Sequence, residues 1–252
     1  MDNYLSSVKN ACTLLKLFLN SSKEFGVTEI SKKLNMSKGA VHKLLITLES
    51  EGFIRQNPKN KQYSLGYTLL ELGNRVLKNH DMVDFSKPYL RQLADSTKEL
   101  VCLCILDGKD AIYIDKVDSP HPVRFNVDIY RRFPLYSTSA ARSILAFQSE
   151  ELIEEVLSQE MKTFTPYSVK AADEMKQRLN NIRQNGYEFS SNMRNVGVTG
   201  IAAPIRDANE EVFAALSIIG PSERMEENIQ KWINFVMDTA QTISNDLGSR
   251  GI

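Results

Sequence analysis

Residues 36–53 read Met-Ser-Lys-Gly-Ala-Val-His-Lys-Leu-Leu-Ile-Thr-Leu-Glu-Ser-Glu-Gly-Phe, and this stretch decides the fold of the N-terminal part of the chain. Its apolar side chains recur at the i, i+3, i+4, i+7 spacing of one helix face: Val41, Leu44, Leu45 and Leu48. Ser37 is the expected N-cap, and Met36 can pack on Val41 as a hydrophobic staple. Because Gly52 tolerates the left-handed backbone that closes many helices, we predict a helix that ends just before it.

The opposite face of this predicted helix is polar and basic, which favours contact with DNA. Lysines meet phosphates, and short or polar side chains reach base edges. We therefore predict a DNA-contact set at the start of the helix: Ser37, Lys38, Gly39, His42 and Lys43. For Gly39 the alternative is a tolerated first-turn glycine, and for His42 it is an ordinary exposed histidine.

The residues on either side of this helix complete the pattern of a winged helix-turn-helix. One helix is predicted at about residues 6–19, and a second, short helix is expected to begin at Thr28 as its cap. A break of about three or four residues separates the second and third helices, as a helix-turn-helix requires. After the third helix, residues 53–56 and 62–65 read as the two strands of a wing.

The first strand and the turn of this wing carry further basic residues. Pro58 and Asn60 are typical turn residues, and Lys59 and Lys61 flank Asn60 at the tip. We expect Lys59 and Lys61 to contact DNA phosphates or the minor groove. The alternative is that the turn is simply exposed to solvent and contacts no DNA. Arg55 is expected either to contact the DNA backbone or to brace the wing.

The charges of the chain are balanced overall but unevenly placed. The 252 residues carry a net charge of zero, with 12 Lys or Arg against 6 Asp or Glu in residues 1–80 and 19 against 25 in residues 81–252. A basic front and an acidic rear predict that only the front meets a polyanion. The length suits one large domain or two ordinary ones.

The composition favours a globular protein of the cytoplasm. Hydrophobic residues make up 42% of the chain and charged residues 25%, as in soluble domains. No apolar run approaches the roughly 20 residues of a membrane span, and the N-terminus lacks the basic and apolar segments of a signal peptide. Three cysteines are too few for a disulfide framework, which favours a reducing compartment.

The rest of the chain alternates helices and strands. Residues 66–79 have apolar positions at helical spacing and predict a linker helix, whose apolar side is expected to face a partner subunit. Further helices are predicted at 85–96, 139–147, 150–158, 171–184 and 224–247, and strands at 100–106, 111–117, 123–128, 187–190, 198–205 and 212–219. Because hairpins outnumber crossovers, we expect a mostly antiparallel sheet flanked by helices, which is an α+β fold.

Landmarks along nearly the whole chain resemble the IclR family of bacterial transcriptional regulators. They include residues 37–48, Val27-Thr28-Glu29-Ile30, Glu51-Gly52-Phe53-Ile54, Asp115-Lys116-Val117, Phe133-Pro134-Leu135-Tyr136-Ser137-Thr138 and Ile201-Ala202-Ala203-Pro204-Ile205, in the family's order. The resemblance implies a winged helix-turn-helix over residues 1–65, a linker helix over 66–80 and a GAF-like α/β effector-binding domain over 81–252. It also implies a repressor, a dimer or dimer of dimers, that binds palindromic double-stranded operator DNA and a small effector, often an organic or aromatic acid.

The resemblance also places an effector pocket in the rear domain. Carried over residue by residue, its lining is Phe125, Phe133, Ser139, Ala140, Ser190, Gly200, Ser217 and Ile219. Aromatic walls and hydroxyl groups would surround the ligand, and a helix start at Ser139 would offer backbone N–H groups to a carboxylate. A capping or surface role is the alternative for the serines, and a plain core role for the phenylalanines.

Two segments near this expected pocket depart from the family's pattern. Ala141-Arg142 stands where the family usually carries Gly-Lys, and Ser190-Ser191-Asn192-Met193 stands where it usually carries acids. A basic or neutral wall favours an anion, but it is also compatible with a neutral ligand or with no ligand.

Other classes of protein stay open. No Ser-His-Asp set, P-loop, zinc spacing or dinucleotide fingerprint is present, so we expect no enzyme, no cofactor and no metal. Cys102 and Cys104 share one face of a predicted strand, which allows a thiol redox sensor, with a buried sheet face as the alternative. A DNA-binding dimer whose rear domain serves only oligomerisation is a further possibility.

Overall fold

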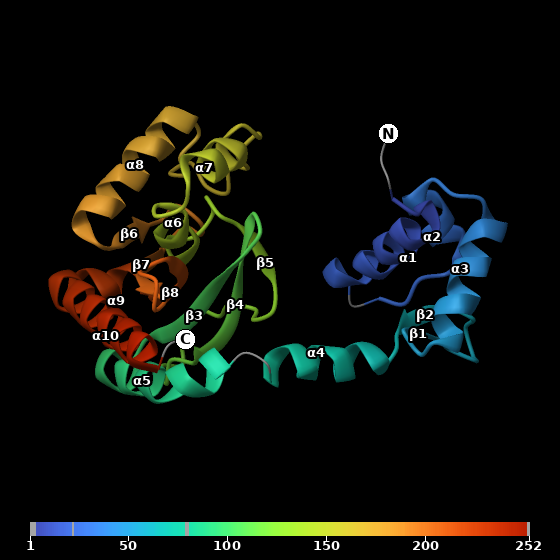
Figure 1. Cartoon of the computed structure of the whole chain (residues 1–252), viewed down its shortest axis with the longest axis horizontal. Coiled ribbons are helices and arrows are strands. Elements are labelled where there is room, and N and C mark those ends of the chain that lie inside the picture. The colour runs from blue at the N-terminus through green and yellow to red at the C-terminus, as the bar shows by residue number, and fades with distance from the viewer. Residues whose placement is uncertain (1–3, 22, 79–80, 251–252) are drawn as a thin grey trace. The chain divides into compact units, whose positions relative to one another are not determined.

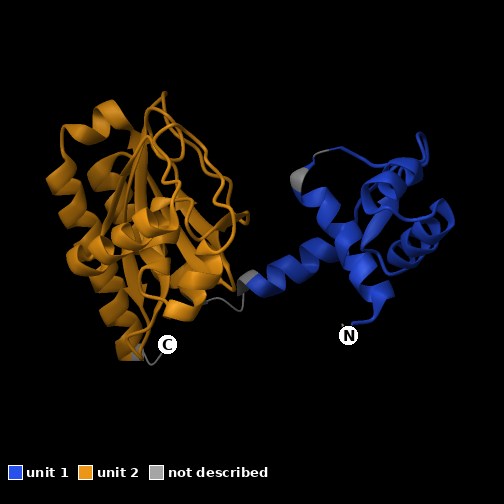
Figure 2. Cartoon of the chain, turned by 90° about the horizontal axis from the view of Figure 1, so that it is seen from above, with its two compact units in different colours: residues 1–81 blue, residues 82–252 orange. Residues whose placement is uncertain are grey.

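The computed structural model describes residues 4–21, 23–78 and 81–250 (Figure 1). The chain forms two compact units, Met1–Asp81 and Met82–Ile252 (Figure 2). The end of the predicted linker, residues 79–80, lies outside the described residues. None of the helices within the described ranges combines the length and the apolar character that a membrane crossing needs.

The first unit is a winged helix-turn-helix followed by one more helix. Its elements are α1 (Ser6–Lys16), the 3-10 helix η1 (Leu17–Asn20), α2 (Val27–Leu34), α3 (Lys38–Ser50), β1 (Ile54–Gln56), β2 (Tyr63–Leu65) and α4 (Thr68–Lys78). The antiparallel strands β1 and β2 form the wing. Fully or nearly fully buried side chains from the helices and the wing make one core: Leu14, Ile30, Val41, Leu45, Ile54 and Tyr63.

The recognition helix α3 begins and ends as the sequence predicts. The Ser37 hydroxyl accepts a hydrogen bond from the Ala40 backbone N–H at 3.2 Å, which satisfies one free donor of the first turn. Gly52 follows the C-cap with a φ of 73°, the left-handed conformation that favours glycine. The cap of α2 was predicted wrongly: this helix begins at Val27 with Gly26 as N-cap, because the Gly26 carbonyl already accepts the N–H of Ile30.

The end of α3 and the start of α4 meet through two glycines. The Gly66 N–H donates to the Phe53 carbonyl at 2.8 Å. A Cβ on Gly66 would lie 2.0 Å from the Gly52 carbonyl oxygen, and a Cβ on Gly52 would lie 2.6 Å from Thr68 Oγ1. Backbone therefore touches backbone here, and the start of α4 is held directly against the end of the recognition helix.

The second unit is a six-stranded antiparallel sheet with helices on both faces, in the strand order β5-β4-β3-β8-β7-β6 (Figure 1). The strands are β3 (Leu100–Asp107), β4 (Asp110–Val117), β5 (Arg132–Pro134), β6 (Glu188–Ser191), β7 (Val198–Arg206) and β8 (Val212–Pro221). The helices are α5 (Asp81–Thr97), α6 (Ser139–Leu145), α7 (Glu150–Leu157), α8 (Ala172–Asn185), α9 (Ser222–Glu226) and α10 (Ile229–Arg250). This confirms the predicted fold class of an N-terminal helix-turn-helix with a C-terminal α/β domain.

The central strand β3 has both of its faces buried. Leu100, Cys102 and Cys104 point toward a core shared with α6, α7 and α8. Val101 and Leu103 point toward the core shared with α5 and α10. Side chains of a strand alternate between faces, so an unbroken apolar run is what a strand covered on both faces needs.

Two predicted elements of the second unit were wrong. The segment predicted as a strand at 123–128 has no regular structure, and the edge strand is the shorter β5. This segment follows two prolines, which lack N–H donors, and its side chains line a pocket instead of a ladder. The predicted helix 224–247 is divided into α9 and α10, since the Asn228 carbonyl accepts the N–H of Trp232 and starts a new helix.

Candidate functional site

The predicted DNA-contact residues lie together on the exposed side of α3. Ser37, Lys38, Gly39, His42 and Lys43 are all exposed, while Val41, Leu45 and Leu48 form the buried side. No neighbouring atom lies within 4 Å of the place where a Cβ on Gly39 would stand. The helix therefore offers a polar, basic stripe that begins with an open first turn, as a helix in the major groove requires.

The wing places its two lysines at the tip and fixes its arginine at the base. Lys59 and Lys61 are exposed at the turn. Arg55 Nε donates to Ser64 Oγ at 3.1 Å and Nη1 to the Tyr67 hydroxyl at 3.3 Å, with the guanidinium 5.0 Å from the Tyr67 ring centre. Of the two predicted roles for Arg55, these contacts favour bracing the wing.

The wing turn is also tied to the loop before α2. Asn60 and Asn57 donate side-chain hydrogen bonds to the carboxylate of Glu24. These donors lower the pKa of Glu24, because they stabilise its charged form. The tip of the wing is therefore anchored while its lysines stay exposed.

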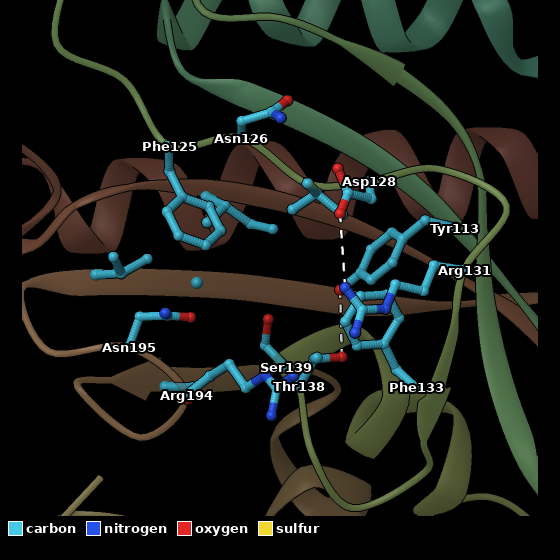
Figure 3. A pocket seen from close by; sticks show the side chains of 15 residues that line it. Tyr113, Phe125, Asn126, Asp128, Arg131, Phe133, Thr138, Ser139, Arg194 and Asn195 are labelled. Carbon is cyan, nitrogen blue, oxygen red and sulfur yellow. Dashed lines mark hydrogen bonds and ion pairs between the residues drawn. The ribbon is translucent and has the colours of Figure 1, made fainter. Parts of the chain in front are cut away.

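The second unit contains a cavity of about 190 Å³. Six of the eight predicted effector residues line it: Phe125, Phe133, Ser139, Ser190, Gly200 and Ile219. Figure 3 shows Phe125 at one end and Tyr113 with Phe133 at the other, and the last two rings meet edge to face at 5.3 Å. The cavity therefore has apolar aromatic ends with polar groups between them.

Two predicted effector residues, Ala140 and Ser217, do not line the cavity. Both are completely buried. Ser217 stands on β8 between its strand partners Ala202 and Cys102, and Ala140 lies in the core cluster between α6 and the sheet.

Gly200 and Ser139 are neighbours in the lining of the cavity. Ser139 is the first residue of α6, where Thr138 caps the helix by accepting from the Ala141 N–H at 3.1 Å. A Cβ on Gly200 would lie 2.7 Å from Ser139 Oγ. The absence of a side chain on Gly200 is therefore what leaves room for the Ser139 hydroxyl at the pocket.

Arg194 is the most unusual charge in the pocket wall. Its guanidinium lies 3.5 Å from the ring centre of Phe164, and Nη1 is buried with no hydrogen-bond partner among the described residues. Burial, followed by the nearby charge of Arg131, lowers the pKa of Arg194. Arg131 itself has a carboxylate nearby, Asp128 at 3.6 Å (Figure 3).

No such carboxylate serves Arg194 in the part of the chain that the structure describes. An arginine keeps its charge in proteins and can only donate hydrogen bonds. The pocket wall therefore contains a cation without a carboxylate partner, which suits an anion.

Two family models together cover most of the chain. The IclR helix-turn-helix domain matches residues 7–58, and the bacterial transcriptional regulator IclR C-terminal domain matches residues 74–245. The chain belongs to the IclR family of bacterial transcriptional regulators.

Relatives of this IclR-family protein match nearly its whole length. It is 34% identical to the HTH-type transcriptional regulator KdgR of Dickeya chrysanthemi, over 94% of this chain and 80% of that protein. The crystal structure of the Thermotoga maritima IclR is 31% identical with a TM-score of 0.73, covering 97% of this chain and all of the other. The match to regulators confirms the prediction of a DNA-binding regulator and not an enzyme.

A more distant solved structure shares the fold. An IclR homolog of Microbacterium hydrocarbonoxydans, crystallised with 4-hydroxybenzoate, has a TM-score of 0.83 at 20% identity and covers 96% of this chain and 99% of that one.

A buried arginine stands behind the pocket of this IclR-family regulator. Arg142 on α6 is 1% exposed. Its Nε donates to Glu188 Oε1 at 2.6 Å, Nη1 to the Tyr136 carbonyl at 3.0 Å and Nη2 to Ser190 Oγ at 2.8 Å. Arg178 Nε donates to the same oxygen of Glu188 at 2.8 Å. Burial, as the largest cause, lowers the pKa of Arg142.

This network determines how Ser190 faces the pocket. A guanidinium donates only, so Ser190 Oγ is the acceptor of that bond and its own hydrogen is left for another partner. Two arginines against one glutamate also leave an excess positive charge beside the cavity.

Several lining residues were missed by sequence reasoning. They are Tyr113, Asn126, Val127, Asp128, Arg131, Thr138, Arg194, Asn195 and Val198. Five of the fifteen lining residues come from the irregular segment between β4 and β5, and four of these lie in the part, 123–128, that was predicted as a strand. For Arg194 a signal existed in the sequence, since it directly follows the stretch 190–193, where the usual acids are missing.

The two cysteines of β3 are poorly placed for a thiol sensor. Cys102 and Cys104 are completely buried and face the same core. Burial raises the pKa of both thiols, which keeps them protonated and unreactive. Across the described ranges, no group of three or more His, Cys, Asp or Glu side chains could hold a metal ion. The contacts favour the buried-sheet alternative for this pair.

Iodoacetamide should therefore modify the native protein at Cys12 alone, because Cys12 is exposed while the other two thiols are not. Mass spectrometry of the native protein should find one adduct, and three after denaturation. A Cys12→Ser variant should take up none in the native state. Labelling of Cys102 in that variant, together with peroxide-sensitive DNA binding, would instead support the redox sensor.

Proposed function

We propose that this chain is a cytoplasmic repressor whose binding to its operator is controlled by a small organic acid, most specifically an aromatic carboxylate. The observation that carries the proposal is Arg194 in the wall of a 190 Å³ cavity, a cation with no carboxylate partner among the described residues. A buried donor on a charged group is costly unless a partner satisfies it. A carboxylate supplies both the charge and the acceptors.

The shape of the cavity supports an aromatic body for this acid. Phe125, Phe133 and Tyr113 provide flat apolar surface at the ends of the cavity. The Ser139 and Ser190 hydroxyls supply further hydrogen-bonding groups near Arg194. The fold neighbour from Microbacterium hydrocarbonoxydans was crystallised with 4-hydroxybenzoate, which supports the same ligand class here.

For the DNA end, we infer that residues 1–65 read the operator and that residues 66–80 connect them to the sensing domain, 81–252. The contact set is Ser37, Lys38, Gly39, His42 and Lys43 for the major groove and Lys59 and Lys61 for phosphate or the minor groove, with Arg55 as a brace. Leu70, Leu72 and Val76 on α4 are 49–61% exposed, which supports pairing of subunits over this helix. A dimer or dimer of dimers would then meet a palindromic operator.

The test of the ligand site is a thermal-shift titration with 4-hydroxybenzoate and benzoate. A ligand at 100 times its Kd should stabilise the wild-type protein by about 2.7 kcal/mol. Arg194→Gln should weaken binding roughly ten- to hundredfold, because hydrogen bonds to charged groups are lost. Arg131→Gln is the matched control and should change binding much less, since Asp128 already lies close to Arg131.

A second readout connects the ligand to DNA. Acids that shift the wild-type melting temperature should release operator DNA in a mobility-shift assay, and should fail to release it from Arg194→Gln. If the protein binds its operator but no acid stabilises it, this proposal is wrong. The rear domain would then serve only oligomerisation.

A further inference from the structure

One residue on the exposed side of α3 differs from all its neighbours on that side. Ile46 is 51% exposed. It follows His42 by four residues and Lys43 by three, so it continues their stripe by one more helical turn. The buried side of the helix is made by Val41, Leu45 and Leu48, and Ile46 takes no part in that core.

The position of Ile46, and not its exposure alone, makes it informative. Single exposed apolar side chains are common on protein surfaces. Ile46, however, lies on the stripe of a recognition helix in a protein of a DNA-binding family. Along such a stripe, side chains at this distance from the helix start still reach base edges in the major groove.

The hydroxyl groups near Ile46 are already used. Thr47 Oγ1 donates to the Lys43 carbonyl at 2.9 Å, and Ser50 Oγ donates to the Thr47 carbonyl at 2.8 Å. The hydrogens of both hydroxyls are therefore committed to the helix backbone. This turn of α3 offers apolar surface to the groove, whereas the turn before it offers His42 and Lys43.

We propose that Ile46 is a specificity-determining residue that contacts the 5-methyl group of a thymine in the operator. In the major groove, thymine alone among the four bases presents a methyl group, and apolar side chains distinguish it by contact. The proposal rests on the proposed placement of α3 in the major groove. It adds that the third turn of α3, through Ile46, contacts a thymine.

The test uses the full-length protein and DNA selected by it from a random-sequence library. In the enriched sequence, each thymine is replaced in turn by uracil, which removes only the methyl group. We expect one thymine in each half-site whose replacement weakens wild-type binding about three- to fivefold, the worth of one buried methyl group. Ile46→Ala should bind the thymine and uracil duplexes equally, and Ile46→Val should retain part of the difference.

Leu19→Ala is the matched control, because Leu19 is an aliphatic residue of the same unit, 69% exposed, and belongs to η1 and not to α3. It should keep the full thymine preference. Uracil sensitivity that persists in Ile46→Ala, or its absence from the wild type, would overturn the proposal while the operator-reading role stands. Failure of the wild type to enrich any sequence would contradict that role and the thymine contact with it. The response to organic acids is a separate measurement and does not enter this test.

Discussion

Gly66→Ala should abolish operator binding by the full-length protein. A Cβ at this position would stand 2.0 Å from the Gly52 carbonyl oxygen and 3.0 Å from the carbonyl carbon of Phe53. Both neighbours are backbone atoms, so no side-chain rotation relieves the overlap. The end of α3 or the start of α4 must move, and we expect the first unit to lose more than about 3 kcal/mol of its free energy of unfolding.

Calorimetry of the full chain, together with a mobility-shift assay, measures this effect. The unfolding transition of the first unit should shift down, while that of the second unit and its response to ligand should be unchanged. Gly73→Ala is the matched control on the same helix, because no atom lies within 4 Å of its added Cβ and alanine favours a helix by about 1 kcal/mol. If Gly66→Ala bound the operator as tightly as the wild type, the backbone at Gly52 and Gly66 could move apart without loss of DNA binding.

Arg142→Met should destabilise the second unit by about 3–5 kcal/mol, because removing one member of a buried ionic network leaves the remaining groups short of hydrogen-bond donors. Glu188 is 3% exposed and would keep only Arg178, while Ser190 and the Tyr136 carbonyl would each lose a donor. Methionine has a similar length, so the effect should come mainly from lost charge and hydrogen bonds.

Urea unfolding followed by Trp232 fluorescence measures this loss, since Trp232 is the only tryptophan of the chain and is buried in the second unit. The matched comparison is the double variant Arg142→Met with Glu188→Gln. It should recover part of the lost stability, because a neutral amide at position 188 needs fewer donors than a carboxylate, and the partly exposed Arg178 keeps contact with water. Equal stability of the single variant and the wild type would mean that the network contributes nothing net.

The parts of the fold that were predicted well are those specified by local sequence. The N-cap Ser37, the apolar spacing of Val41, Leu45 and Leu48, and the left-handed Gly52 all act within one helix, so α3 could be predicted closely. The hairpin of β3 and β4 was likewise marked by a short turn between two apolar runs. The segment 123–128 has the residue types of a strand, but whether it pairs depends on a partner edge that the segment itself does not encode.

Sequence reasoning could assign a residue to the pocket only where its residue type, such as glycine or phenylalanine, was itself informative. Gly200, Phe125 and Phe133, which the family resemblance assigned to the pocket, line the cavity, and their contact with an effector stays a prediction. Arg142 and Arg194 were not assigned roles, because what distinguishes them is their partners. One has Glu188, which lies 46 residues away in sequence, and the other has no carboxylate among the described residues. Whether a buried charge has a partner depends on which residues the fold brings together, and local sequence does not show this.

The strand order of the second unit also sets the sequence of events when the chain is made. β3 ends at Asp107 and its neighbour β8 begins only at Val212, so roughly a hundred residues of translation separate them. During that interval β3 has one unpaired edge, and α10, which covers one of its faces, has not yet been synthesised. An apolar strand with an open edge is prone to join other chains. The nascent regulator therefore passes through a period of exposure to aggregation that ends only when α10 has been made and covers this face of the sheet.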